Sequence, residues 1–78
     1  MSEFLPVETK TDLELLDQDD IFAGYVAGLN DQTEPGSDKS RGYWHGWRNA
    51  QADRGRVPVD VHMQRLIRDI LGAAVHAN

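Results

Sequence analysis

Hydrophobic residues recur at steps of three and four in three stretches of the chain, which is the period of amphipathic helices. The first stretch runs from Ile21 to Leu29 and follows a carboxylate-rich start, which favours a helix N-terminus. The second is the aromatic segment after Ser40, and the third carries the widest apolar stripe. We predict helices over residues 18–31, 40–54 and 58–75. The stripe of the last helix comprises Val59, Met63, Leu66, Ile67, Ile70, Leu71 and Ala74.

Local signals mark the ends of these helices. Pro35-Gly36 lies inside a polar loop over 32–40, and Gly55 is placed to end the second helix. Pro58 fits the first turn of the third helix. Upstream, the run Thr11-Asp12-Leu13-Glu14 fits a capping box and predicts a turn or two of helix over 11–16.

No alternation typical of a strand is present, so the expected fold class is all-α. We predict a small three-helix domain built on a glycine-packed helical hairpin plus a C-terminal amphipathic helix. Residues 1–16 are expected to form an acidic N-terminal arm that is partly disordered. Residues 17–78 are expected to form the helical domain.

Each of the first two predicted helices carries glycines spaced four residues apart, which places them on one helix face. An interior glycine destabilises a helix by about 1 kcal/mol relative to alanine, so a packing reason is expected. We predict an antiparallel hairpin in which the two glycine faces meet, with one tyrosine and one tryptophan beside the contact. The residues given this structural role are Gly24, Tyr25, Gly28, Gly42, Gly46 and Trp47.

Composition limits the class of protein. A chain of 78 residues makes one small domain, which buries roughly 60–65% of its extended-chain surface. It has no cysteine, which excludes disulfides and thiolate metal sites. No apolar run reaches the ~20 residues that span a bilayer, and the N-terminus lacks the features of a signal peptide. We therefore expect a cytoplasmic protein without a membrane partner.

Charge is distributed unevenly along the chain. The formal net charge is −5, yet residues 39–56 carry +4 because five cations face a single carboxylate, Asp53. Residues 1–38 carry −9, with ten carboxylates against Lys10. A basic island that also holds two tryptophans and a tyrosine therefore lies within an acidic protein, and its residues are the first candidates for a binding site.

Arginine and aromatic residues in one helix are typical of RNA-binding surfaces, where guanidinium groups contact phosphates and aromatic rings stack on unpaired bases. Trp44 and Arg48 lie four apart, so the guanidinium can also lie over the indole. Alternatively, both tryptophans belong to the core and the arginines are solvated surface. The acidic N-terminal half could fold back on the island and cover it, or could repel nucleic acid. The candidate RNA- or partner-binding residues are Lys39, Arg41, Tyr43, Trp44, Arg48, Arg54 and Arg56.

Two segments, GYVAG at 24–28 and SRGYWHGWRNAQADR at 40–54, together resemble the bacterial ribosome modulation factor family, which includes the similar plasmid-borne CrpP-type proteins. The resemblance covers about residues 22–54. It implies a small helical protein that binds the 30S subunit and favours inactive ribosome dimers during starvation. This chain departs from the family in its acidity, in a tryptophan spacing one residue shorter, and in Glu34-Pro35-Gly36 where the family carries Cys-Pro-Tyr. The arm and the last helix have no counterpart in short members.

The resemblance and the local charge predict a binding module that engages the small ribosomal subunit or rRNA through a basic aromatic helix, in translation regulation under stress. The alternative is a small acidic protein–protein inhibitor or adaptor, phage- or plasmid-related, whose acidic run could mimic nucleic-acid phosphates. Its partner would be a basic nucleic-acid-binding protein. The candidate acidic surface comprises Asp12, Glu14, Asp17, Asp19 and Asp20. The apolar stripe of the last helix also allows a homodimer.

Other chemistry finds little support in the sequence. The three histidines lack compact ligand spacing, so we expect no metal, and we expect His45 on the helix surface. The run Gly36-Ser37-Asp38-Lys39-Ser40 lacks the glycines and the preceding strand of a phosphate-binding loop. A drug-modifying enzyme, the third alternative, would need nucleotide turnover. We therefore expect no enzyme and no cofactor.

Overall fold

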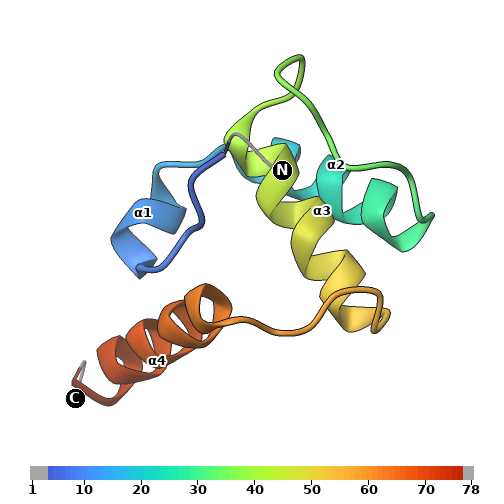
Figure 1. Cartoon of the computed structure of the whole chain (residues 1–78). Helices are drawn as coiled ribbons and strands as arrows, with labels where there is room; N and C mark the ends of the chain where they lie inside the picture. Colours follow the sequence, from blue (N-terminus) through green and yellow to red (C-terminus); the bar gives the residue numbers. More distant parts are fainter. Residues whose placement is uncertain (1–3, 77–78) are drawn as a thin grey trace.

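The computed structural model describes the backbone of residues 4–76 and the side chains of residues 4–72. Within this part of the chain there are four helices and no strand (Figure 1). They are α1 (Lys10–Glu14), α2 (Gln18–Leu29), α3 (Arg41–Asp53) and α4 (Val61–His76). The predicted all-α class is confirmed, with a short helix ahead of the three longer ones. Residues 1–3 of the predicted arm, residues 77–78 and the side chain of Ala74 lie outside the described residues.

Side-chain oxygens cap α2 and α3 where the sequence signals place them. The Asp17 carboxylate accepts from the amide of Asp19 at 2.8 Å and from that of Asp20 at 3.2 Å. The Ser40 hydroxyl accepts from the amide of Tyr43 at 3.2 Å. These bonds satisfy amides that have no partner within the helix, so they fix where each helix begins.

The start signals proposed for the other two helices are wrong. Thr9, and not Thr11, caps α1, because its hydroxyl accepts from the amide of Asp12 at 3.0 Å. Asp60 serves the same purpose for α4 by accepting from the amide of Met63 at 3.0 Å. Pro58 therefore lies ahead of the helix instead of in its first turn. A proline has no side-chain oxygen with which to satisfy the first free amides, whereas aspartate does.

Glycines allow α2 and α3 to pack at backbone contact. A β-carbon at Gly24 would overlap the carbonyl of Tyr43, and one at Gly46 would overlap the carbonyl of Ile21. At Gly28 a β-carbon would lie 2.5 Å from the Trp47 carbonyl oxygen. The predicted meeting of glycine faces is confirmed, and these residues are kept small by packing.

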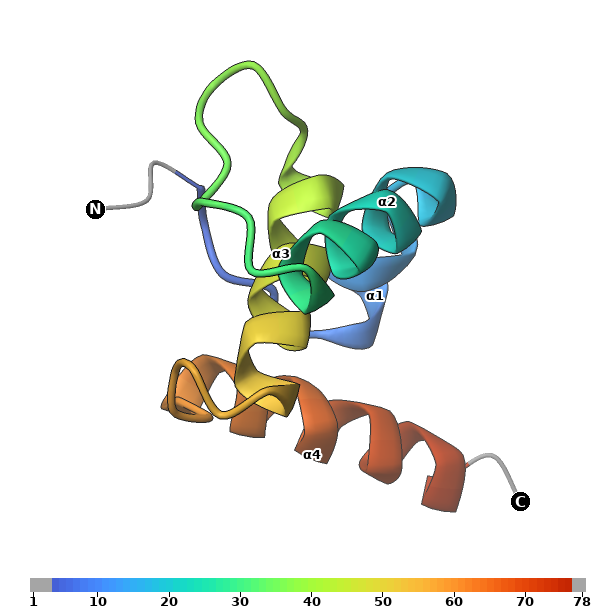
Figure 2. The same cartoon turned by 90° about the vertical axis from the view of Figure 1, so that its right-hand side faces the viewer.

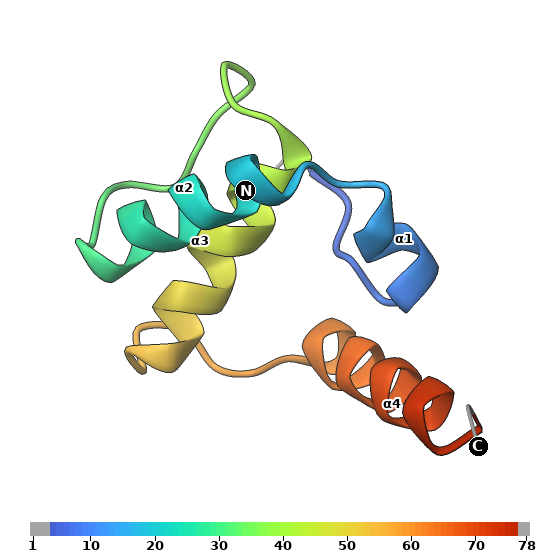
Figure 3. The same ribbon diagram turned by 180° about the vertical axis from the view of Figure 1, so that it is seen from behind.

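The direction predicted for this pair of helices is wrong. Gly42, near the start of α3, lies against Asp17 and Asp20 at the start of α2. Gln51, near the end of α3, donates to the carbonyl of Gly28, near the end of α2, at 2.8 Å. The two helices therefore run in the same general direction as they cross, as Figure 3 shows, and not antiparallel.

The loop over residues 30–40 makes this direction possible. Its eleven residues can span up to about 36 Å, about twice the ~18 Å length of α2, so the chain can return to the start of that helix. The indole N–H of Trp47 donates to the Gln32 carbonyl at 2.7 Å, and that of Trp44 donates to the Glu34 carboxylate at 2.9 Å. The two tryptophans thus hold the returning loop, and both are buried.

α4 lies on the side of the molecule toward the C-terminal end of α3 and beside α1 (Figure 2). Met63 and Leu66 on its inner face are buried, whereas Ile67 and Leu71 are 51% and 59% exposed. Its apolar stripe is therefore wider than the surface it covers. Among residues 4–76, no helix has both the length and the apolar character needed to cross a bilayer.

Candidate nucleic-acid interface

The basic segment folds into α3, where steps of three and four residues bring Arg41, Trp44 and Arg48 onto one face. The guanidinium carbon of Arg48 lies 5.0 Å from the Trp44 ring centroid, in a cation–π contact. Arg48 also forms an ion pair with Asp60, just ahead of α4. Burial lowers the pKa of Arg48, yet an arginine side chain stays protonated in proteins. This face therefore holds two guanidinium groups beside one indole.

Arg41 is held by the N-terminal arm. It donates to both oxygens of Asp12, at 2.7 and 2.6 Å, in a bidentate pair. It also donates to the main-chain carbonyls of Leu5 at 2.8 Å and Pro6 at 3.0 Å. The hydrogen bond from Arg41 lowers the pKa of Asp12. The arm thus supplies carbonyl and carboxylate oxygens to a single guanidinium.

The arm also covers Trp44. The Phe4 ring stacks on the indole, with centroids 5.7 Å apart and an interplanar angle of 25°, and Trp44 is 3% exposed. Val7, three residues after Phe4 in the arm, is also buried, at 2% exposure. Farther along, the Glu8 carboxylate accepts from Arg65 at 2.9 Å, which ties the arm to α4.

The other end of α3 forms a separate cationic group around Asp31. Arg54 and Arg56 both pair with its carboxylate, at 2.9 and 3.1 Å. Gln51 donates to the same side chain at 3.0 Å. The hydrogen bond from Arg56 is the main reason that the pKa of Asp31 is lowered. Asp31 itself has a φ of 55°, a left-handed conformation that aspartate adopts more readily than most residues.

Lys39 and Tyr43 lie near the N-terminal end of α3. The Lys39 ammonium sits 5.2 Å from the Tyr43 ring centroid and 4.0 Å from the carboxylate of Asp38. The seven candidate binding residues therefore fall into three groups. Arg41 and Trp44 contact the arm and Arg48 lies over Trp44, Arg54 and Arg56 meet at Asp31, and Lys39 lies over Tyr43.

His45 is buried, at 6% exposure, so its predicted place on the helix surface is wrong. The i to i+4 step on α3 brings Asn49 within 3.1 Å of its Nε2 atom. Burial lowers the pKa of His45, and the nearby Arg48 and Arg41 charges act in the same direction. A neutral imidazole is therefore favoured. The described residues contain no cluster of three or more potential metal ligands.

The candidate acidic surface is largely used within the fold. Asp12 binds Arg41, Asp17 caps α2, and Asp20 accepts from the hydroxyl of Ser40 at 2.8 Å. Glu14 pairs with Lys10 at 3.4 Å. Asp19, in the first turn of α2, is exposed. Four of the five carboxylates thus act individually, as a helix cap, as ion-pair partners or as a hydrogen-bond acceptor.

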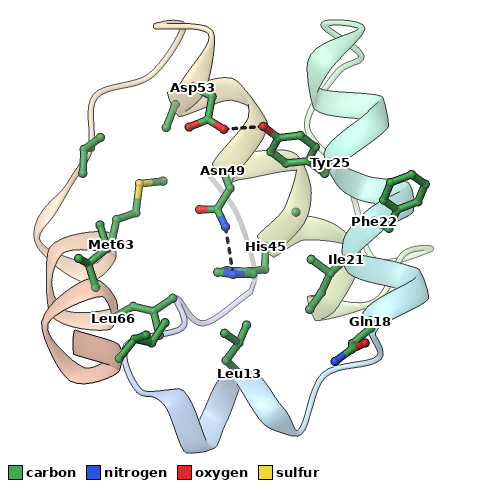
Figure 4. A pocket seen from close by; sticks show the side chains of 15 residues that line it. Leu13, Gln18, Ile21, Phe22, Tyr25, His45, Asn49, Asp53, Met63 and Leu66 are labelled. Atoms are coloured by element: carbon green, nitrogen blue, oxygen red, sulfur yellow. Dashed lines mark hydrogen bonds between the residues drawn. The ribbon is translucent and has the colours of Figure 1, made fainter. Parts of the chain in front are cut away.

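An open apolar cleft of about 580 Å³ lies between α4 and the other helices (Figure 4). His45 and Asn49 line it from α3, with their hydrogen bond marked in the figure. At its rim the Tyr25 hydroxyl donates to Asp53 at 2.6 Å, which raises the pKa of that phenol and links α2 to the end of α3. The apolar lining includes Leu13, Ile21, Met63, Leu66, Ile67 and Ile70.

The sequence did not predict the pairing partners of the basic segment, which include Phe4, Asp12, Asp31, Glu34 and Asp60. Asp31 and Asp60 lie in or beside loops, where periodicity gives no signal about contacts. The charge contrast between the two parts of the chain was the one available signal, since it favours folding of acidic residues onto the basic helix. It indicates no particular pairs.

Comparison of the chain with protein-family models, with curated proteins and with solved structures finds no match. The likeness to ribosome modulation factors therefore rests on the two short segments at 24–28 and 40–54.

Proposed function

We propose that this chain is an RNA-binding module of the ribosome-modulation type, which engages the small ribosomal subunit or its rRNA through α3. The observation that carries the proposal is the placement of Arg41, Trp44 and Arg48 on one face of α3, with the Arg48 guanidinium over the Trp44 ring. Single-stranded RNA is bound by cations that follow the phosphates and by aromatic or guanidinium planes that stack on bases. The residue match at 24–28 and 40–54 supports a ribosomal target over other RNA.

The ion pairs within the chain are compatible with phosphate binding. Arg54 and Arg56 are partly exposed, and exposed ion pairs with a carboxylate stabilise a fold only weakly. A phosphate can therefore replace the Asp31 carboxylate at small cost. The net charge of −5 opposes approach of a polyanion at long range, so binding is expected to be weak and to fall steeply as salt rises.

The alternative acidic inhibitor is less well supported. A phosphate mimic needs carboxylates that are free to meet a partner's cations. Four of the five candidates already serve within the chain, as a helix cap, an ion-pair partner or a hydrogen-bond acceptor. Capture of a basic protein, with no RNA involved, would favour this alternative.

Co-sedimentation with purified 30S subunits at low and moderate salt tests the proposal. The chain should travel with the subunits at low salt and be lost at moderate salt. Arg56→Ala should weaken the association and reduce the slope of log affinity against log salt by about one. Arg68→Ala removes the same charge from α4 and should leave association unchanged. Absence of the chain from the 30S fractions at low salt would reject the proposal.

A further inference from the structure

The N-terminal arm covers Arg41 and Trp44 on the face of α3 that also carries Arg48. It places the ring of Phe4 on the indole and the carboxylate of Asp12 on the Arg41 guanidinium. These two contacts have the same chemistry as a stacked base and a bound phosphate. The arm therefore presents a nucleotide-like pair of groups to this face.

We propose that residues 4–12 act as an internal competitor for RNA, closing the nucleotide position on α3 until the arm lifts away. This inference rests on the proposed function, since it concerns regulation of the same face. RNA and the arm cannot both stack on Trp44, which is 3% exposed with the arm in place. Each RNA contact at this position therefore requires loss of the corresponding arm contact.

The arm can lift without loss of the α2–α3 packing. The glycine contacts at 24, 28 and 46 join α2 to α3 directly and involve no residue of the arm. The indole N–H of Trp44 bonds to Glu34 of the loop, so its position does not depend on Phe4. Phe4 and Val7 hold the arm by apolar contacts, whereas its ion pairs, such as Glu8 with Arg65, are weakened by water and salt.

Only molecules with an open arm can bind RNA at this position. The apparent affinity is therefore the intrinsic affinity multiplied by the open fraction. Removing an arm contact should therefore strengthen RNA binding, whereas removing an ordinary structural contact leaves it unchanged or weakens it. This direction of change separates a competitor from a segment of the core.

The test measures fluorescence anisotropy of a short labelled single-stranded RNA with the full chain and with Phe4→Ser and Asp12→Asn. Each variant should lower the dissociation constant by about tenfold, the scale expected for one aromatic stack or one competing charge pair. Without RNA, each should also raise acrylamide quenching of tryptophan fluorescence, and added RNA should reverse that rise.

Phe22→Ser and Asp19→Asn are matched controls, because they make the same chemical changes at exposed positions of α2 that do not contact the Arg41–Trp44 face. They should leave the dissociation constant within about twofold of the parent. Arginine-dependent RNA binding that is equal in arm variants and controls would overturn this inference and leave the proposed function standing. No RNA binding by the parent or by any variant would overturn both.

Discussion

Gly24 of α2 lies directly against the main-chain carbonyl of Tyr43 in α3, so close that a β-carbon at position 24 would overlap it. The reciprocal contact joins Gly46 to the carbonyl of Ile21. With Gly28 against the Trp47 carbonyl, the crossing of these two helices is backbone on backbone at three points, and it positions the face that carries Trp44. Loss of this helix crossing is therefore expected to disturb the face of α3 that carries Trp44.

Gly46→Leu is expected to destabilise the domain by at least about 3 kcal/mol, because a side chain cannot share space with a carbonyl. For a domain of marginal stability this is enough to abolish most of the cooperative urea transition. Gly72→Ala is the matched control, since no atom lies within 4 Å of a β-carbon there. Its higher helix propensity should add about 1 kcal/mol at most. Equal melting temperatures for Gly46→Leu and the parent would refute the backbone contact.

Shortening the loop tests the direction of the two helices. Deletion of residues 35–38 leaves seven residues to return along α2, with a reach of about 23 Å that leaves little room to pass around side chains. We expect a clear loss of stability in urea unfolding. Insertion of four glycine and serine residues at the same point should cost less than about 1 kcal/mol. If the deletion is as harmless as the insertion, the helices run antiparallel.

The two faces of α4 should respond differently to truncation. Leu66 is 7% exposed, so Leu66→Ala is expected to lower the free energy of unfolding by about 2–4 kcal/mol. Leu71 is 59% exposed, and Leu71→Ala should change it by less than about 0.5 kcal/mol. Chemical denaturation of both variants measures the difference. Equal losses would mean that α4 does not pack through Leu66.

Stability should fall as the solution becomes mildly acidic. Burial lowers the pKa of His45, with help from Arg48 and Arg41, so the unfolded chain takes up a proton more readily than the folded one. The contribution is fully present above the ordinary histidine pKa of about 6.5 and is lost as pH falls through the lowered value. Urea unfolding near neutral pH and about two units lower should show this loss. His45→Gln should flatten the dependence, and an unchanged slope in that variant would exclude His45 as its source.

Much of the fold follows from periodicity and local chemistry. The apolar steps of α2, α3 and α4 identified three helices, and the glycine spacing identified where two of them touch. The direction of that pair did not follow, because the glycines lie on the same helix faces in either direction. The direction of the two helices depends on the length of the loop that joins them. Residues 30–40 are long enough for either a parallel or an antiparallel pair.

The candidate interface was only partly predictable. The i to i+4 relation of Trp44 and Arg48 followed from helix geometry, and their contact is present. The partners Phe4 and Asp31 did not follow, because tertiary contacts between loops and helices leave no periodic signal. His45 was misplaced for a related reason. The helix is covered by the arm and faces α4 across the cleft, so positions that appear polar in sequence are also buried.

The most direct measurement of the central claim is an NMR titration of the isotope-labelled full chain with a short single-stranded RNA at low salt. The largest shifts should fall on α3 at Arg41, Trp44 and Arg48, with matching changes along residues 4–12 as the arm lifts. The indole N–H signal of Trp44 should move more than that of Trp47. Absence of shifts, or shifts confined to α4 and the apolar cleft, would contradict the claim that α3 is the RNA-binding face.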